Sequence, residues 1–263
     1  MGHLTSPYID DVVVLGETIE ECRENVTATI NLSLKLGFVV HPRISVLEET
    51  QEVVFLGFIL NSRDMIISLT PEKATTLKRL CLAAIDTQKI SIRILAQLVG
   101  QMVATFPSVE RGKVYYRKLD NEKSTQLKRS KGNFEAEFQL PPYCLDDLHW
   151  WVDNIENANN PISHEPPSII IQSDASETGW GGVRQDKSTG GSGSSQENQN
   201  HINYLELLAA FLTLKALCSQ EKQIHIMIEI DKTTAVSYIN NMGGTKKLCN
   251  DITREIWEWC FRK

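Results

Sequence analysis

Several features are scarce in this 263-residue chain, and each absence excludes a class of protein. The longest apolar run, Val53–Leu60, has eight residues, whereas a helix that crosses a membrane needs about 18 or more. The start, Met1–Pro7, lacks the basic and then apolar pattern of a secretory signal. The six cysteines include no CxxC pair, so neither a disulfide framework nor a zinc site is expected. We therefore expect an intracellular protein, in the cytoplasm or nucleus, with no membrane partner.

Excess charge of either sign is also small over the whole chain. The formal net charge is -6, which by itself argues against a nucleic-acid partner. The positive charge is concentrated, however, because residues 111–131 hold eight Lys or Arg against two Asp or Glu. Such a segment is typical either of a surface that faces phosphate groups or of a solvated helix face. Charge alone leaves both interpretations open.

The pattern of apolar residues divides the chain into three regions of a mixed α/β (α+β) fold. Residues 1–70 alternate short apolar runs with turns, and residues 71–160 are mostly helical. A proline-rich stretch, 161–167, is expected to be a linker. Residues 168–263 again alternate strands and helices, which predicts a mixed sheet covered by helices.

Individual elements follow from local signals. Thr70 and Pro71 predict a helix start, with Thr70 as N-cap and Pro71 as the first helical residue. Helical spacing of apolar residues predicts helices over 18–36, 91–106 and 145–155. The other expected elements are a hairpin of two strands, 53–60 and 65–69, and a flexible Gly/Ser-rich loop, 188–195.

Two adjacent acids, Asp10 and Asp11, directly precede the apolar run Val12–Leu15. Adjacent carboxylates repel each other, and aspartate has a poor propensity for strands. A position at a hairpin tip or a bound metal ion would relieve this repulsion. Mg²⁺ prefers a few carboxylate oxygens together with substrate phosphates. An exposed acidic turn explains the same pair, and both interpretations stay open on these residues alone.

The residues around this pair resemble the palm of reverse transcriptases, most closely those of DIRS-type retrotransposons. Tyr8–Asp11 (YIDD) resembles motif C, Gly37–Pro42 resembles motif D and Val53–Leu60 resembles motif E, the primer grip. Residues 1–70 would then be the end of a palm, and 71–160 a helical thumb and connection. The resemblance implies an RNA-directed DNA polymerase (a nucleotidyltransferase) that binds primer-template and dNTPs, with Mg²⁺ or Mn²⁺ held by Asp10 and Asp11.

The same resemblance, together with the basic segment 111–131, predicts the residues that contact nucleic acid. They are Tyr8, Phe55, Leu56, Gly57, Arg111, Lys113, Arg117, Lys118, Lys128, Arg129 and Lys131.

Two departures from the palm pattern bear on polymerase activity. The family places another catalytic aspartate and the fingers well before motif C, and the hairpin here begins at residue 8. After His41-Pro42 the sequence reads Arg43-Ile44, where DIRS-type sequences commonly have a lysine that protonates pyrophosphate. Arginine is a poor general acid because its pKa is too high. We expect no polymerase activity from this chain alone.

Three further acids follow strands or lie at a helix start. Asp174 ends the strand that starts at Ser168, Glu206 lies in the first turn of an apolar helix, and Asp231 follows a second strand. If the strands are neighbours and the helix packs on the sheet, the three carboxylates converge into a metal site for phosphodiester hydrolysis. Structural roles remain open: Asp174 as a turn cap, Asn203 with Glu206 as a capping box, and Asp231 as an N-cap.

In order and local sequence, these elements resemble RNase H-like domains of retroelements. Asp174-Ala175-Ser176, the Leu205–Leu207 helix and Asp231–Val236 carry the likeness, with the Gly179–Val183 strand. It implies that Asp174, Glu206 and Asp231 bind two Mg²⁺ (or Mn²⁺) ions for two-metal phosphoryl transfer. It also implies that the enzyme, an endonuclease, cuts RNA in RNA–DNA hybrids, which it recognises through 2′-hydroxyls.

The RNase H pattern is incomplete in this chain. Lys232 stands where relatives often have Asn, a cation beside the metal site, and the expected fourth acid and last helix would follow Lys263. We therefore expect a piece of a longer retroelement polyprotein. The alternative is a non-catalytic nucleic-acid-binding remnant whose active sites have degenerated. The sequence does not indicate an oligomeric state.

Overall fold

The computed structural model describes residues 5–87 and 89–263 and has a mixed α/β fold, as expected. The N-terminal region starts with a hairpin of β1 (Thr5–Tyr8) and β2 (Asp11–Val14), followed by α1 (Ile19–Lys35). The side chain of Thr18 caps α1 by accepting a hydrogen bond from the backbone N–H of Glu21, at 3.1 Å. Gly37, with φ of 88°, follows its end. The helix predicted over 18–36 is confirmed to within one residue at each end.

An antiparallel sheet joins the N-terminal region to the helices. Its strands, in spatial order, are β3 (Glu52–Phe55), β4 (Phe58–Asn61), β5 (Ile66–Leu69) and β8 (Asn159–Pro161). The prediction of one strand over 53–60 was wrong, because Leu56 and Gly57, with φ of 53° and 76°, turn the chain between β3 and β4. Pro161, at the start of the expected linker, pairs with Ile66 in this sheet.

The middle of the chain is a helical bundle with its own core. Pro71 is the first residue of α2, as predicted, and Thr70 precedes it. The side chain of Trp151 is fully buried, and a Cβ on Gly112 would lie 2.5 Å from its ring, so glycine lets the two elements approach closely. The elements are α2 (Pro71–Asp86), β6 (Ile90–Ser91), α3 (Ile92–Ala104), α4 (Gly112–Tyr115), α5 (Arg117–Arg129), β7 (Glu137–Phe138), α6 (Pro142–Asn154) and the 3₁₀ turn η1 (Ile155–Asn157).

The C-terminal region contains a four-stranded sheet in the order β11-β10-β9-β12, in which β9 and β12 run parallel. Its elements are β9 (Ile169–Ala175), β10 (Gly179–Arg184), β11 (Lys187–Ser192), the 3₁₀ turn η2 (Glu197–Gln199), α7 (Ile202–Leu217), β12 (Ile226–Glu229), α8 (Thr233–Asn240) and α9 (Lys247–Cys260). Residues 188–192, predicted as loop, instead form most of β11. The glycines of β10 and β11 pair along this hairpin, so backbone hydrogen bonds hold a segment whose side chains predict flexibility.

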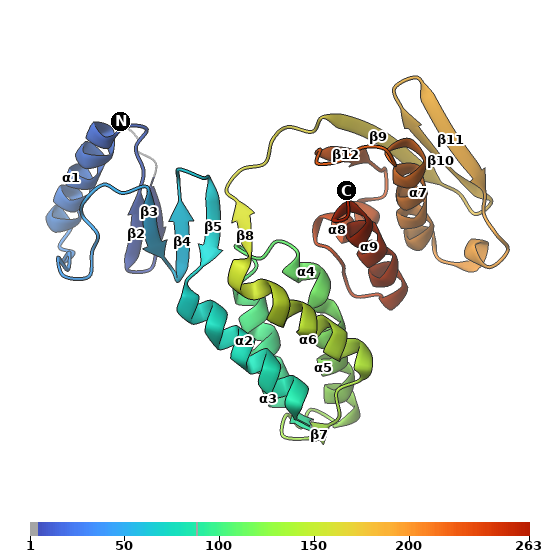
Figure 1. Ribbon diagram of the computed structural model, residues 1–263, viewed down its shortest axis with the longest axis horizontal. Helices are drawn as coiled ribbons and strands as arrows, with labels where there is room; N and C mark the ends of the chain where they lie inside the picture. The colour runs from blue at the N-terminus through green and yellow to red at the C-terminus, as the bar shows by residue number, and fades with distance from the viewer. Residues whose placement is uncertain (1–4, 88) are drawn as a thin grey trace.

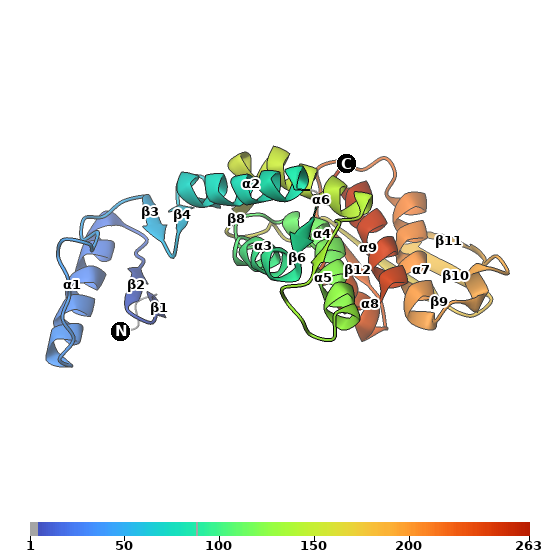
Figure 2. The same cartoon turned by 90° about the horizontal axis from the view of Figure 1, so that it is seen from below.

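Figures 1 and 2 show an elongated molecule with the N-terminal elements at one end and the C-terminal sheet at the other. The helical bundle lies between them, and both views place α9 beside the bundle. One buried cluster fills the bundle and a second lies between the C-terminal sheet and helices α7, α8 and α9. Within the described residues, no helix is both long enough and apolar enough to span a bilayer.

Candidate active site

Two neighbouring strands bring two of the predicted acids to one edge of the C-terminal sheet. β9 and β12 are parallel, with Gln172 opposite Glu229 in the last pair of their register. Asp174 lies near the C-terminal end of β9, and Asp231 is the second residue after β12. Because the carboxyl ends of parallel strands meet at the same edge, both side chains reach one place.

Helix α7 supplies the third acid from its buried face. The side chain of His201, not Asn203, caps this helix by accepting from the backbone N–H of Asn203 at 3.1 Å. Glu206 is therefore in the second turn rather than the first, and the capping-box alternative was wrong. Glu206 is only 2% exposed, because α7 packs against β9 and β10.

The three carboxylates converge. One oxygen from each of Asp174, Glu206 and Asp231 lies within 4.8 Å of the others. Burial, and then the charges of Asp231 and Asp174, raise the pKa of Glu206 to about 7, and nearby Lys232 acts in the opposite direction. Within the described residues, buried Oε2 of Glu206 has no hydrogen-bond partner. Three hard oxygen donors that repel one another, one of them unsatisfied, fit a divalent cation such as Mg²⁺.

Other residues take the capping positions that the sequence left open for Asp174 and Asp231. Ser176 closes the turn after β9, where its Oγ accepts from the backbone N–H of Gly179 at 3.2 Å. Lys232, not Asp231, is the residue that precedes α8, and no side chain caps that helix. Asp174 and Asp231 are exposed beside a buried acid, so their placement is accounted for by the cluster rather than by capping.

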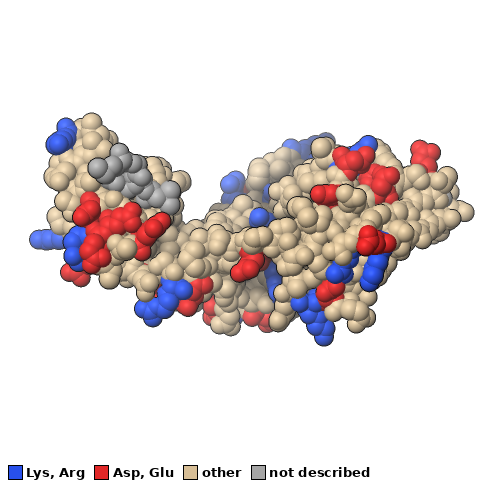
Figure 3. All heavy atoms as spheres, turned by 90° about the horizontal axis from the view of Figure 1, so that it is seen from above, with Lys and Arg blue, Asp and Glu red and all other residues tan. Residues whose placement is uncertain are grey.

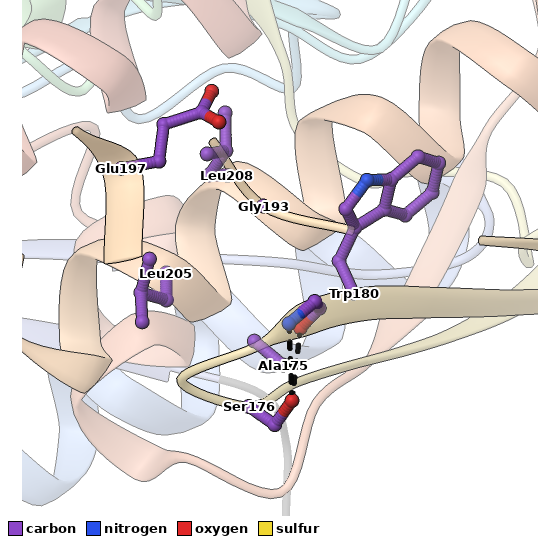
Figure 4. A pocket seen from close by; sticks show the side chains of 8 residues that line it. Ala175, Ser176, Trp180, Gly193, Glu197, Leu205 and Leu208 are labelled. Atoms are coloured by element: carbon purple, nitrogen blue, oxygen red, sulfur yellow. Dashed lines mark hydrogen bonds between the residues drawn. The ribbon is translucent and has the colours of Figure 1, made fainter. Parts of the chain in front are cut away.

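A small hollow lies where the β9–β10 turn faces the start of α7, and its lining begins at Ala175, the residue after Asp174. Figure 4 shows the indole of Trp180 on one side of it and the Ser176 turn below. Trp180 is not among the site residues predicted from the sequence. The residues that line the hollow are Ala175, Ser176, Gly179, Trp180, Gly193, Glu197, Leu205 and Leu208.

The aspartate pair of the N-terminal region is placed differently. Asp10 is in the two-residue turn between β1 and β2, and Asp11 starts β2 opposite Tyr8. Ile9 in that turn has φ of 54°, a left-handed conformation that costs a β-branched residue about 1–2 kcal/mol. Both aspartates are exposed. Within the described residues, no third His, Cys, Asp or Glu joins them in a metal-binding group.

The other predicted contacts of the N-terminal region lie on two hairpins. Tyr8 is 56% exposed at the end of β1. Leu56 and Gly57 form the β3–β4 turn after Phe55, the last residue of β3. Lys73 of α2 donates from Nζ to the Leu56 carbonyl at 2.8 Å, so this turn is fixed against the helical bundle.

The basic segment 111–131 does not present all of its charge to solvent. Arg111 and Arg117 contact the C-terminal region, and Nζ of Lys118 lies 3.9 Å from the buried carboxylate of Asp147. Figure 3 shows Lys and Arg side chains in separate groups among acidic ones on the face in view, not as one continuous basic surface. Among the predicted contacts in this segment, those whose side chains make no hydrogen bond, ion pair or ring contact with other described residues are Lys113, Lys128, Arg129 and Lys131.

Sequence comparison relates part of the chain to a viral polyprotein. No protein-family model matches it. It is 30% identical over 113 residues to the enzymatic polyprotein of cauliflower mosaic virus (strain D/H), covering 37% of this chain and 17% of the polyprotein. The Strasbourg strain gives the same identity and coverage. The match therefore spans about a sixth of that polyprotein's length.

Structural comparison covers nearly the whole chain. A foamy viral protease-reverse transcriptase in complex with an RNA/DNA hybrid matches with a TM-score of 0.51 and 15% identity, over 98% of this chain and 34% of that one. A second structure, of the foamy viral protease-reverse transcriptase dRH in complex with double-stranded DNA, matches with a TM-score of 0.50 and 16% identity, over 97% and 44% of the two chains. This chain is thus similar in sequence to part of a pararetroviral enzymatic polyprotein and in fold to part of a retroviral reverse transcriptase.

Proposed function

We propose that this chain is the palm end, thumb and RNase H-like region of a retroelement reverse transcriptase, and that its C-terminal region hydrolyses RNA in RNA–DNA hybrids. One observation carries the proposal: Asp174, Glu206 and Asp231 converge within 4.8 Å around a buried carboxylate. The match to a viral enzymatic polyprotein and the reverse-transcriptase fold support it. The finer assignment to DIRS-type elements rests on the motifs of the N-terminal region.

The residues have distinct tasks in this proposal. Asp174 and Asp231 are exposed, so they meet both the cation and the phosphodiester from the solvent side. Glu206 would hold the cation from the buried side, and its raised pKa means that cation binding would compete with protonation of this carboxyl group. Two Mg²⁺ ions bound there would supply an activated water and would stabilise the leaving 3′ oxygen.

The test is cleavage of an end-labelled RNA strand in a hybrid, with Mg²⁺ or Mn²⁺, by the whole 263-residue chain. Asp174→Asn removes one ligand, and Asp186→Asn is the matched control because Asp186 is exposed in the β10–β11 turn. We expect cleavage by the unaltered chain and by the control, and none by Asp174→Asn. Mn²⁺ binding measured by electron paramagnetic resonance should follow the same order. Equal cleavage by all three proteins would contradict the proposal.

A second candidate is the nucleic-acid-binding remnant, and Lys232 is the observation that favours it. Its ammonium group is close enough to lower the pKa of Glu206, and so it competes with a cation for the same carboxylates. In that case the unaltered chain binds a hybrid but neither cleaves it nor binds Mn²⁺. The same two measurements therefore separate the candidates.

For the N-terminal region we propose that Asp10 and Asp11 serve polymerase chemistry only within a longer protein. Tyr8 and the Phe55–Gly57 turn would contact primer-template there, and dNTPs would be substrates. The exposure of both aspartates, with no further acid joining them among the described residues, supports this view. Primer extension by the purified chain would refute it.

A further inference from the structure

Two arginines of the basic segment are directed at the C-terminal region. Nη2 of Arg117 donates to the carbonyls of Asn241 and Gly243, at 3.1 and 3.4 Å. These carbonyls follow the C-terminal end of α8, where the helix dipole favours a cation. The Arg111 guanidinium lies 4.5 Å from the centroid of the Phe261 ring, just beyond α9.

A third arginine, Arg254 of α9, makes the reverse contact. Its Nη1 donates to Oδ1 of Asp147 in α6 at 2.7 Å, and the Asp147 side chain is fully buried. The guanidinium also lies 4.8 Å from the centroid of the Tyr115 ring, which stacks on Trp150 at 4.1 Å. A buried charge needs a partner, and losing one member of such a pair leaves the other uncompensated.

The Asp147–Arg254 pair lies where α6 and α9 meet. Figures 1 and 2 both show α9 running beside the bundle formed by α4, α5 and α6. The covalent connection, residues 162–168, is a mostly exposed segment without helix or strand. Noncovalent contacts, rather than the connection, therefore set the orientation of the two regions.

We propose that the Asp147–Arg254 pair, supported by Arg117 and Arg111, docks the C-terminal region onto the helical bundle as one rigid body. Arg254 is then a positioning residue: it fixes the edge that carries Asp174, Glu206 and Asp231 relative to any duplex held by the bundle. Arg111 and Arg117 thus serve this interface instead of binding phosphate groups, which leaves Lys113, Lys128, Arg129 and Lys131 to contact nucleic acid. The effect on cleavage rests on the proposed function, whereas docking itself does not.

The experiment compares the unaltered chain with Arg254→Ala, Arg254→Lys and the control Arg262→Ala, an exposed arginine just after α9. Docking is measured by small-angle X-ray scattering and by the rate of proteolysis within residues 162–168. We expect Arg254→Ala to increase the radius of gyration and to raise the proteolysis rate at least several-fold. Arg254→Lys keeps the charge but not the two-pronged donor, so it should restore part of the effect. Arg262→Ala should match the unaltered chain.

The cleavage readout uses a hybrid with one blunt end and records the lengths of the RNA products. Arg254→Ala should turn a few preferred lengths into a broad distribution, while Arg262→Ala keeps the preferred ones. If the unaltered chain does not cleave, the proposed function fails, and scattering and proteolysis still decide the docking. If Arg254→Ala is unfolded by circular dichroism, Arg254→Gln replaces it. Glutamine keeps much of the side-chain length but cannot neutralise Asp147, so this variant should also loosen the two regions. Unchanged scattering and proteolysis in a folded variant would overturn the inference.

Discussion

Both ends of this molecule carry acidic residues at the end of a strand, but the N-terminal region is largely exposed and the C-terminal region has a buried core. In residues 5–68 the only buried residue is Asn25, and Ile9, Val39 and Ile44 are more than four-fifths exposed, at 85%, 91% and 81%. The C-terminal region has a closed core in which Ile171 and Leu207 are fully buried. A strand-end acid becomes part of a site where a packed sheet and helix deliver its partners.

The two ends also differ in how many acidic side chains the fold brings together. Asp174 meets Asp231 from the end of the neighbouring parallel strand and Glu206 from α7, which packs on β9 and β10. Asp10 and Asp11 lie on a two-stranded hairpin, and within the described residues no other element brings them a third acid. We therefore expect substitutions of similar kind to have very different consequences at the two ends.

The largest expected effect is the loss of a carboxylate that holds the cation. Glu206→Gln should lower hybrid hydrolysis by about 10³-fold, because a bound metal contributes several kcal/mol to such reactions. Asp10→Asn should leave hydrolysis unchanged. The rates are measured on a labelled hybrid at saturating Mg²⁺. A similar loss in both variants would break the comparison, since it would link the two acidic groups in one activity.

Core packing gives the second test, with two leucines on helices at opposite ends. Leu214→Ala in α7, where Leu214 is 2% exposed, should lower the free energy of unfolding by about 2–5 kcal/mol. Leu34→Ala in α1, where Leu34 is 56% exposed, should change it by about 0.5 kcal/mol or less. Urea denaturation followed by circular dichroism measures both. A large cost for Leu34→Ala would show that α1 packs on a partner in solution.

The sequence predicted local elements well wherever one signal dominated. Helix α1 followed from its apolar spacing, and the start of α2 from Thr70 and Pro71. Predictions were wrong where backbone conformation or backbone pairing, rather than the side-chain pattern, determines the secondary structure. The apolar run 53–60 hides a turn because Leu56 adopts φ of 53° before Gly57, and 188–192 pairs as a strand despite its loop-like composition.

The acids of the candidate site were found from the sequence because they end strands or lie near a helix start. Their distances depend on strand order, which no local pattern contains. Asp147 and Arg254 were missed for a related reason: their contact joins α6 to α9 across 107 positions of sequence. A signal was present in α6, where Asp147 shares the helical face of buried Cys144, Leu148 and Trp151.

Charge burial provides the third test. Burial raises the pKa of Asp147 to about 6 against the attraction of Arg254, whereas an unfolded chain gives about 3.9. The folded state thus binds this proton more tightly, so its contribution to stability is complete below about pH 4 and is lost as the pH rises through 6, by up to about 3 kcal/mol. Asp147→Asn should flatten the unfolding free energy over this range, and the exposed neighbour Asp146→Asn should not. Parallel pH profiles for all three proteins would contradict the shift.

The smallest expected effect concerns Lys232, which separates a working site from a degenerate one. Its ammonium group acts on Glu206 against the two aspartates, and such a charge, when water screens it, contributes on the order of 1 kcal/mol. Lys232→Asn should therefore raise the affinity for Mn²⁺ about five-fold, as measured by electron paramagnetic resonance. Lys222→Asn, at an exposed position before β12, is the control and should leave affinity unchanged. If both variants bind Mn²⁺ like the unaltered chain, Lys232 does not compete with the cation. The case for a degenerate site then loses its main support, and the difference between the two ends of the molecule rests on how many acids each fold brings together.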